Sequence, residues 1–459
     1  MFRSVLVANR GEIALRVLRA CRELGIRGVA VYSEADRDAP WLEQAERALC
    51  IGPARAEASY LNANAILQAA EQCECQAIHP GYGFLAENAT FAARCEQHGI
   101  AFIGPRAASI RRMGDKAEAR RTMERAGLPV LPGSRGRLAT AADARRAAEA
   151  IGYPVLLKAA AGGGGRGMRR ADDAQALERA FDEAAGEAHA AFADGGLYLE
   201  KLVVPARHIE FQILADAFGA TIHLGERECS VQRKHQKLVE ETPSPALDAR
   251  TRDALGRRVV RAVGSLGYRG VGTVEFLLDA AGQFAFLEMN TRLQVEHPIT
   301  EAVTGIDLVA EQIRVAAQVP LRIVQREVVR TGHAIEFRIN AEDPQDGFRP
   351  DPGTITSFVE ARTSVAGARL RWDSAVRPGY RVPPHYDSLL GKLVVHAADR
   401  PTALAAAEQA LGTLAIGGVR TTIPFQRRLL GLPAFRDGVY DTSLVERLLA
   451  TPGAAAAGS

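Results

Sequence analysis

The chain has 459 residues, of which 47% are hydrophobic and 24% are charged, and its formal net charge is +3. This length exceeds what one simple core can organise, so we expect about two to four domains in a soluble globular protein. Because the small net charge is spread over the whole chain, the composition argues against a nucleic-acid-binding protein.

Neither a membrane span nor an export signal is indicated. The first apolar run ends at Asn9, too early for a signal peptide, and no run approaches the ~18 residues of a transmembrane helix. The six cysteines include one Cys-x-Cys pair, Cys73 and Cys75, but no spacing typical of zinc sites. We therefore expect a reduced, cytoplasmic protein without a disulfide framework.

Residues 1–105 alternate short apolar strands with amphipathic helices, which predicts an open parallel α/β sheet with functional loops at the carboxyl ends of its strands. The turn at Asn9, Arg10 and Gly11 lacks the full Gly-x-Gly-x-x-Gly spacing of a dinucleotide site. In the loop HPGYGF, Tyr82 stands between two glycines. It either projects into a cleft or packs within a turn.

From Gly114 onward the sequence predicts a charged helix, a helix over 141–151, a strand over 153–160, a helix over 172–192 and a strand over 196–203. The glycine run 162–165 either lets backbone N–H groups approach phosphates or forms a flexible linker. Because it is not a P-loop, the phosphate interpretation depends on Lys158 and Arg166. Residues 200–203 are either an adenine-binding strand end or a plain one.

Residues 208–241 predict two or three antiparallel strands that end in a basic stretch from Arg227 to Lys237. Glu226 and Glu228 dilute this positive charge. Since phosphate or bicarbonate requires fewer cations than a nucleic acid polymer, the stretch favours a small anion.

Residues 282–298 begin as an apolar strand and then carry a polar residue at every second position, namely Glu288, Asn290, Arg292, Gln294 and Glu296. A continuous strand would direct all five side chains to one face. Burying such a set is costly unless a cation or an anionic ligand lies beside it. The pattern therefore predicts a site.

Glu275 lies in the preceding apolar strand, and a turn over 279–282 predicts that Glu275 faces Glu288 across a hairpin. With the Asn290 oxygen, these carboxylates suit Mg²⁺ or Mn²⁺ shared with a phosphate. The alternative is an ordinary hairpin whose charges are solvated. The apolar neighbours of both acids favour the metal site.

The last third of the sequence predicts a helix over 305–318, a mostly β segment and an alanine-rich helix over 401–415. In the strand HAIEFRINAED, Arg338 shares a face with Glu336 and Asn340. We expect the end of the chain to be a disordered tail.

Long motifs in a fixed order connect the sequence to a known family. They include ANRGEIA, IHPGYGFLAEN, KAAAGGGGRGM, ERECSVQRKHQK, EMNTRLQVEHP and YDSLLGKL. From end to end the chain resembles the biotin carboxylase subunit of biotin-dependent acyl-CoA carboxylases, in the ATP-grasp superfamily. The resemblance implies an N-terminal α/β domain (1–113), an ATP-grasp domain (114–324) with a mobile glycine-rich lid (131–203), a C-terminal mixed β/α domain (330–446) and a tail (447–459).

The resemblance also assigns roles to individual residues. ATP contacts are implied for Lys116, Lys158, Gly164, Gly165, Glu200, Lys201, Leu202, Val203, His208, Gln232, His235, Glu275 and Glu288. The implied metal ligands are Glu275, Glu288 and Asn290, and the implied bicarbonate ligands are Lys237, Arg292, Gln294 and Val295. Glu296 would be the catalytic base, and Arg338 and Tyr82 would face biotin.

The implied reaction is the ATP-dependent carboxylation of biotin through carboxyphosphate, with Mg²⁺ or Mn²⁺ as the metal and bicarbonate as a substrate. A carrier normally displays its biotinyl lysine in an Ala-Met-Lys-Met turn, and no Met-Lys pair occurs here. We therefore expect biotin on a separate carrier protein. The resemblance further implies a carboxyltransferase partner and a homodimer, with acetyl-CoA as the expected final acceptor and another acyl-CoA or a keto acid as the alternative acceptors. Two alternatives are another ATP-grasp ligase and a non-catalytic regulatory protein that binds ATP.

Overall fold

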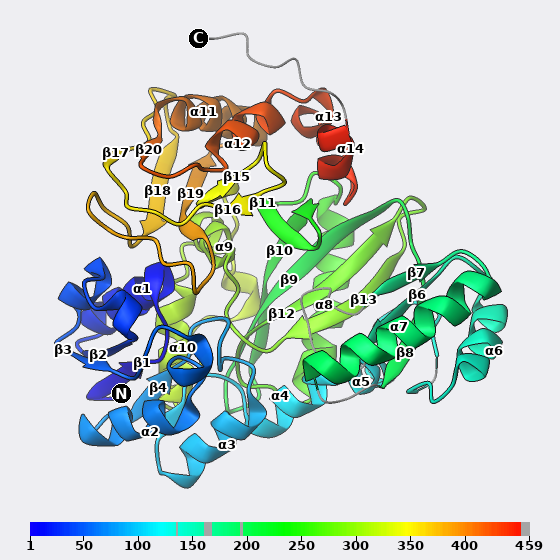
Figure 1. Cartoon of the computed structure of the whole chain (residues 1–459), viewed down its shortest axis with the longest axis horizontal. Coiled ribbons are helices and arrows are strands. Elements are labelled where there is room, and N and C mark those ends of the chain that lie inside the picture. Colours follow the sequence, from blue (N-terminus) through cyan, green and yellow to red (C-terminus); the bar gives the residue numbers. More distant parts are fainter. Residues whose placement is uncertain (135, 160–167, 193–195, 451–459) are drawn as a thin grey trace.

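The computed structural model describes residues 1–134, 136–159, 168–192 and 196–450. Figure 1 shows a small sheet near the N-terminus, a long central sheet, and a lobe at the right that carries α6 and α7. The glycine run 162–165, including Gly164 and Gly165, lies outside the described residues. No helix within the described ranges is both long and apolar enough to cross a membrane.

The N-terminal sheet has the order β3-β2-β1-β4-β5, and all its strand pairs are parallel, which confirms the expected open α/β sheet. Its strands are β1 Ser4–Val7, β2 Arg27–Tyr32, β3 Arg47–Cys50, β4 Ala77–His79 and β5 Ala101–Phe102. The accompanying helices are α1 Gly11–Glu23, α2 Ala63–Gln72, α3 Ala89–Gln97 and α4 Ala107–Gly114.

The loops that follow β1 and β4 are joined at the carboxyl edge of this sheet. Asn9 donates hydrogen bonds from Nδ2 to the carbonyls of Pro80, at 2.6 Å, and Tyr82, at 2.7 Å. Gly81 between them has φ +63°, and a Cβ there would lie 2.9 Å from the Asn9 amide. The glycine is therefore required for the close approach that places Tyr82.

An eight-stranded antiparallel sheet forms the centre of the molecule, in the order β13-β12-β9-β10-β11-β14-β19-β18. Its strands are β9 Ala206–Ala215, β10 Thr221–Arg233, β11 Gln236–Thr242, β12 Gly270–Asp279, β13 Phe284–Asn290, β14 His333–Asn340, β18 Arg369–Ser374 and β19 Leu389–Ala397. Because β11 pairs with β14, one continuous sheet joins the ATP-grasp segment to the C-terminal segment.

Helices pack against the strands of this sheet, and short strands lie beside its C-terminal part (Figure 1). The helices are α5 Lys116–Arg125, α8 Ala249–Ser265, α9 His297–Thr304, α10 Leu308–Ala316, α11 Arg400–Thr413, α12 Ile423–Leu430, α13 Pro433–Arg436 and α14 Leu444–Ala450. The short strands are β15 Glu342–Asp343, β16 Arg349–Pro350, β17 Ser357–Val359 and β20 Ala415–Gly417.

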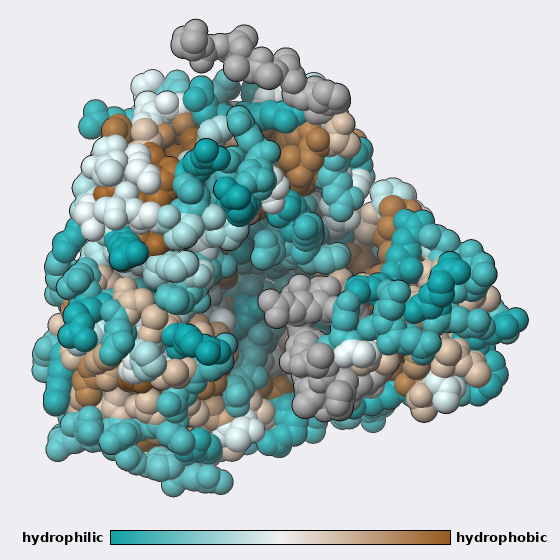
Figure 2. All heavy atoms as spheres, in the orientation of Figure 1, coloured by the Kyte–Doolittle hydropathy of each residue, from teal (hydrophilic) through white to brown (hydrophobic). Residues whose placement is uncertain are grey.

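The lobe has a hydrophobic core of its own. Strands β7 Arg169–Ala171, β6 Val155–Ala159 and β8 Leu197–Lys201 form a three-stranded sheet with helices α6 Ala141–Ile151 and α7 Ala174–Phe192. Leu157, Leu177 and Leu199 are fully buried between these elements. Figure 2 shows a hollow between the lobe and the body, with hydrophilic side chains on its floor.

Two expectations about element boundaries are wrong. Strand β13 ends at Asn290 and α9 begins at His297, so Arg292, Gln294 and Glu296 lie in a loop instead of on one strand face. Helix α14 continues to Ala450, so residues 447–450 are helical and do not belong to a tail. The remaining tail residues, 451–459, lie outside the described part.

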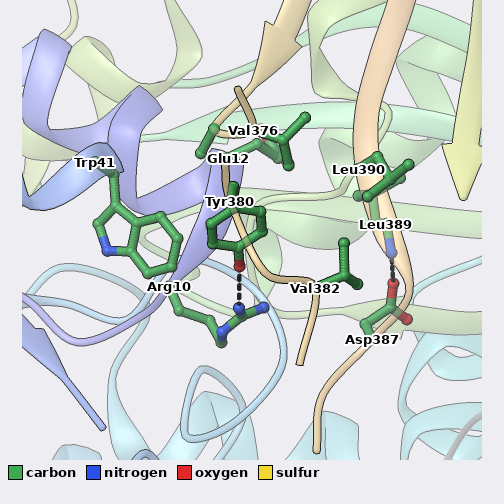
Figure 3. Close-up of a pocket in the computed structure, with 11 residues that line it drawn as sticks. Arg10, Glu12, Trp41, Val376, Tyr380, Val382, Asp387, Leu389 and Leu390 are labelled. Atoms are coloured by element: carbon green, nitrogen blue, oxygen red, sulfur yellow. Dashed lines mark hydrogen bonds between the residues drawn. The ribbon is translucent and has the colours of Figure 1, made fainter. Parts of the chain in front are cut away.

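Arg10 connects the N-terminal sheet to the C-terminal segment through side-chain contacts. Its guanidinium pairs with Asp36 at 2.8 Å and donates to the Tyr380 hydroxyl at 3.0 Å, while its Cζ lies 4.4 Å from the Tyr386 ring centroid. A small cavity lies beside this contact, lined by Arg10, Tyr380 and Glu12 among others (Figure 3). The two segments therefore meet next to the residues around Tyr82.

A second buried ion cluster joins β11 to the C-terminal helices. Glu241 accepts hydrogen bonds from His333 at 2.7 Å, from Arg400 at 2.7 and 3.0 Å, and from the Tyr440 hydroxyl. Burial alone would raise the pKa of Glu241, but the bonds from His333 and Arg400 outweigh it and lower the pKa from 4.5 to about 2.

This lowered pKa predicts the acid sensitivity of the C-terminal segment. Glu241 stabilises the fold fully above its unfolded pKa of 4.5, and the contribution disappears as the pH falls toward 2. We expect Glu241→Gln to lose about 3 kcal/mol of stability at pH 7. Between pH 3 and 7, the melting temperature of Glu241→Gln should be lower, and should change less with pH, than that of the exposed control Glu149→Gln. Equal curves would contradict the assignment.

Candidate active site

The two acids predicted to face each other do so. Glu275 and Glu288 are register partners on β12 and β13, with an irregularity in the pairing directly after Glu275. Glu275 is only 4% exposed, whereas the Glu288 side chain is 31% exposed and lies 3.7 Å from the Lys116 ammonium. The alternative of a hairpin with two solvated charges is therefore wrong for Glu275.

Glu275 is surrounded by donors. The amide of Asn290 donates to its Oε1 at 2.7 Å, Gln294 and the Lys237 ammonium each at 3.1 Å, and His208 Nε2 lies 3.0 Å from Oε2. Burial would raise the pKa of Glu275, but Lys237 and His208 outweigh it and hold the pKa well below its usual range. The carboxylate therefore stays ionised at neutral pH.

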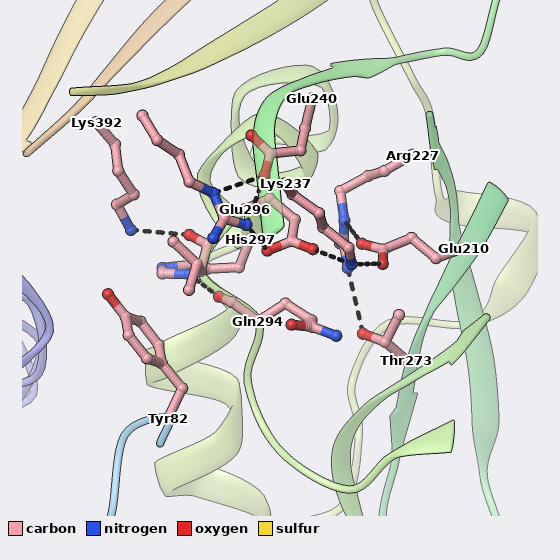
Figure 4. A network of polar contacts seen from close by, with 12 residues as sticks. Tyr82, Glu210, Arg227, Lys237, Glu240, Thr273, Gln294, Glu296, His297 and Lys392 are labelled. Atoms are coloured by element: carbon pink, nitrogen blue, oxygen red, sulfur yellow. Dashed lines mark hydrogen bonds and ion pairs between the residues drawn. The ribbon is translucent and has the colours of Figure 1, made fainter. Parts of the chain in front are cut away.

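Lys237 connects three carboxylates from different segments, two of which, Glu210 and Glu296, are labelled beside it in Figure 4. Its ammonium donates to Glu210 at 2.5 Å, to Glu296 at 2.6 Å and to Glu275 at 3.1 Å. Arg227, fully buried beneath it, bonds to Glu210 at 2.5 Å. Lys237 thus unites β9, β11, β12 and the loop before α9 around one cation.

Glu296 lies between two cations. Lys237 donates to its Oε1, and Arg338 donates to its Oε2 at 2.9 Å. Although Glu296 is fully buried, Lys237 and Arg338 hold its pKa well below the ordinary value. Arg338 also donates from Nε to Glu240 at 2.7 Å. Burial dominates at Glu240 and raises its pKa to about 7.

Arg292 is fixed by acceptors on both sides of it. Its guanidinium donates to Glu87 at 2.8 Å, to the Gln294 amide oxygen at 2.9 Å and to the Asn290 amide oxygen at 3.0 Å. The predicted convergence of Asn290, Arg292 and Gln294 is therefore present. It arises from side-chain contacts in a loop and not from strand periodicity.

A second cationic group lies toward the lobe. The Lys158 ammonium donates to Glu200, and both side chains are buried. Lys201 donates to the carbonyls of Gly152, at 3.1 Å, and Tyr153, at 2.9 Å, while Leu202 and Val203 follow β8 in a half-buried loop.

The hairpin between β10 and β11 brings further residues toward Lys158. Gln232 is the register partner of Lys237, and His235 lies in the turn with φ +66°. Loss of solvation, followed by the charge of Lys158, lowers the pKa of His235. His208 lies beside Glu275 at the other end of the group.

Tyr82 and Val295 are both held by contacts at the N-terminal side of the site. The sequence allows either a cleft or a packed turn for Tyr82, whose hydroxyl donates to Glu12 on α1 and whose ring is partly buried. The carbonyl of Val295 accepts a hydrogen bond from Lys392 at 2.8 Å. Both residues are therefore fixed within the described site.

Several charged residues of the site were not found from the sequence. Glu210, Glu240 and Lys392 are each fully buried in a strand. A charge enclosed by apolar neighbours was the available signal, as in IEF for Glu210 and GKLV for Lys392. Glu87 lies in a loop and carried no such signal. All six cysteines fall in the described part, and all are unpaired thiols.

The edge formed by Glu275, Glu288 and Asn290 carries two carboxylates and an amide, residue types that a hard divalent cation takes as ligands, and Glu288 is half-exposed. His208, Glu210 and Glu275 have ligand atoms within 4.8 Å of one another. The Lys237 ammonium already bonds to Glu210 and Glu275.

Three family models match the chain. The biotin carboxylase N-terminal domain matches residues 1–110, the ATP-binding domain of the carbamoyl-phosphate synthase L chain matches 115–324, and the biotin carboxylase C-terminal domain matches 336–447. Together they cover the segment that carries Lys237 and Glu275 and the segment that carries Arg338.

Named relatives and solved structures agree with these matches. The chain is 52% identical to a Nostoc biotin carboxylase over 97% of this chain and 99% of that protein, and 53% identical to the Arabidopsis thaliana chloroplastic biotin carboxylase over 98% and 83%. The Campylobacter jejuni biotin carboxylase structure has a TM-score of 0.94 and 48% identity, over 97% of this chain and 99% of that one. The chain therefore belongs to the biotin carboxylase family.

Proposed function

We propose that the protein uses ATP and bicarbonate to carboxylate biotin that is attached to a separate carrier protein. ATP would phosphorylate bicarbonate to carboxyphosphate, which would release CO₂ and phosphate, and a biotin ureido nitrogen would take up the CO₂. The observation that carries this proposal is the buried group of Lys237, Glu296 and Arg338 next to the Glu275 and Glu288 edge. One acid there lies between two cations, where a small anion can be bound and deprotonated.

The nucleotide would lie in the hollow between the lobe and the central sheet. The backbone of Leu202 and Val203 would meet the adenine edge, and Lys116 and Lys158 would meet the phosphates. The other residues with an implied ATP contact are Glu200, Lys201, His208, Gln232, His235 and, outside the described residues, Gly164 and Gly165. Mg²⁺ or Mn²⁺ on Glu275, Glu288 and Asn290 would supply charge neutralisation for the phosphates.

Bicarbonate would bind to Lys237, Arg292, Gln294 and the backbone of Val295. The Arg292 guanidinium offers a planar fork, already held in place by Glu87 and Asn290. An anion that binds to Lys237 takes over part of the positive charge that holds the pKa of Glu296 low. Substrate binding would therefore raise the proton affinity of Glu296 and make it a better base.

Arg338 would stabilise the negative charge of deprotonated biotin. Its guanidinium bonds to Glu240 and Glu296. These two bonds hold the guanidinium beside the proposed base, Glu296. Lysine would lose this fork geometry. Tyr82 lies at the N-terminal side of the same region and would border the biotin.

Partners and location form the finer part of the proposal. A Hydrogenobacter thermophilus 2-oxoglutarate carboxylase domain with 48% identity was solved as a dimer with MgADP and bicarbonate, which supports a homodimer here. We also propose a carboxyltransferase partner, acetyl-CoA as the final acceptor for fatty acid synthesis, and a cytoplasmic location. One of the pyruvate carboxylase subunits of Methanothermobacter thermautotrophicus is 50% identical to the chain, which makes a keto acid the competing acceptor.

One assay separates this function from its alternatives. ATP hydrolysis should require bicarbonate and should be stimulated by free biotin. Another ATP-grasp ligase would hydrolyse ATP without stimulation by biotin. A non-catalytic regulatory protein would bind ATP without turnover.

The metal assignment predicts a loss of turnover in Glu288→Gln and in Glu275→Gln. Each substitution removes one charged ligand and should abolish activity while the fold is retained. Glu288→Gln is the cleaner variant, because the nearest cation to Glu288 is Lys116 at 3.7 Å, whereas Glu275 also holds Lys237 and His208. Electron paramagnetic resonance should show weaker nucleotide-dependent Mn²⁺ binding than in Glu149→Gln. Normal activity in either variant would remove the assignment.

The role of Glu296 as a base predicts a selective defect. Glu296→Ala should lower bicarbonate-dependent turnover by roughly 10²–10⁴-fold, the usual contribution of a positioned base. The KM for ATP should barely change, because Glu296 contacts Lys237 and Arg338 and not the Lys158 group. If ATP binding were lost while the rate persisted, Glu296 would have a structural role.

The separate carrier predicts an unmodified chain. The five methionines precede Phe, Gly, Glu, Arg and Asn, so the sequence has no Met-Lys acceptor pair. Intact mass from cells that biotinylate proteins should therefore show no biotin. A cognate carrier should be carboxylated far more efficiently than free biotin, because contacts remote from the ring orient it. A biotin-sized mass increment would refute this part of the proposal.

A further inference from the structure

A lysine without a role in the proposed reaction lies in the middle of β19. Lys392 is 0% exposed, and its register partners are Arg338 on β14 and Asp373 on β18. Side chains of directly opposite residues in antiparallel strands project from the same face of the sheet. Lys392 is therefore on the same face as Arg338, directed toward the loop that carries Glu296 (Figure 4).

Its ammonium joins three segments of the chain. It donates to the carbonyl of Val295 at 2.8 Å and lies 3.0 Å from Glu12 Oε1. The Tyr82 hydroxyl donates to the same Glu12 oxygen. Through Lys392, the strand β19, the helix α1 and the loop after β4 are therefore linked to the loop between β13 and α9.

The charges around Lys392 identify Glu12 as its direct partner. A buried ammonium costs several kcal/mol unless it is paired, so an apolar residue would be the simpler choice in this strand. Of the other nearby acids, Asp373 is held by Arg371 at 2.7 and 2.8 Å, and neither carboxylate oxygen of Glu336 has a hydrogen-bond partner among the described residues. Although burial opposes the charge of Lys392, Glu12, Glu336 and Asp373 outweigh it and raise the lysine pKa.

The contact between Lys392 and the Val295 carbonyl restrains the backbone directly before Glu296. The carbonyl of Gln294 lies 2.7 Å from His297 Nδ1, and the next carbonyl, that of Val295, is held by Lys392. Two consecutive peptide groups are thus restrained immediately before Glu296. Without Lys392, the Val295 carbonyl would lose its donor, and the peptide group that joins Val295 to Glu296 would lose its fixed direction. The Glu296 side chain that follows this peptide and the Val295 N–H that precedes it would then be less well positioned.

We propose that Lys392, held by Glu12, is a positioning residue that fixes the Val295–Glu296 peptide for bicarbonate and links this loop to Tyr82. This inference rests on the proposed function, since it assumes that bicarbonate binds at Val295. Lys392 does not touch the reacting atoms. Its effect should therefore appear in the use of bicarbonate and not in the use of ATP.

The test is steady-state ATP hydrolysis with varied bicarbonate and ATP. The double variant Lys392→Met/Glu12→Gln removes both members of the ion pair, so no unpaired charge from that pair remains buried. We expect its KM for bicarbonate to rise by roughly 10–100-fold, the usual effect of losing a charge-assisted hydrogen bond, while the KM for ATP stays within about twofold.

Arg400→Met is the matched control, because it removes another cation of the C-terminal segment, one that bonds to Glu241 and to the carbonyls of Phe435 and Arg436 and not to Val295. Its KM for bicarbonate should not change. A double variant with wild-type melting temperature and unchanged KM for bicarbonate would overturn the inference alone. If the double variant does not fold, the KM for bicarbonate is measured in Glu12→Gln instead. An unchanged KM in that variant would likewise overturn the inference. Absence of bicarbonate-dependent hydrolysis in the unsubstituted protein would instead overturn the proposed function and this inference with it.

Discussion

The site depends on one buried cation that holds three carboxylates. Lys237 contacts Glu210, Glu275 and Glu296, which come from two strands and a loop. Without the ammonium, these acids would repel one another in a region from which water is largely excluded. The cation therefore allows the acids of β9, β12 and the loop before α9 to lie close together.

The same constraint explains why the C-terminal segment belongs to the site. Glu296 has a second free oxygen after Lys237 is bound, and Arg338 on β14 occupies it at 2.9 Å. That arginine arrives because β11 pairs with β14 in one continuous sheet. The site is therefore complete only when the ATP-grasp segment and the C-terminal segment share that sheet.

The sequence predicts contacts between residues of one local pattern, such as a hairpin. It does not predict contacts between residues that are distant in the chain. The Glu275 and Glu288 pairing follows from a hairpin turn of known length. The alternation of polar residues predicts a strand beyond Asn290, but β13 ends there, and the same two-residue period continues through a loop that contains a turn. Arg292 reaches the site through Glu87, more than 200 residues away in the chain, and no local pattern contains that contact.

The arrangement also connects substrate binding to proton transfer. Lys237 and Arg338 are each bonded to carboxylates of the chain, and Glu296 is common to both. An anion that approaches these cations competes with Glu296, and with Glu210, Glu275 and Glu240, for their hydrogen bonds. If it takes the bonds of Glu296, that acid loses the charges that keep its pKa low. In the proposed reaction, binding of the acid to be deprotonated and activation of the base would therefore be one event, which no isolated glutamate in water could achieve.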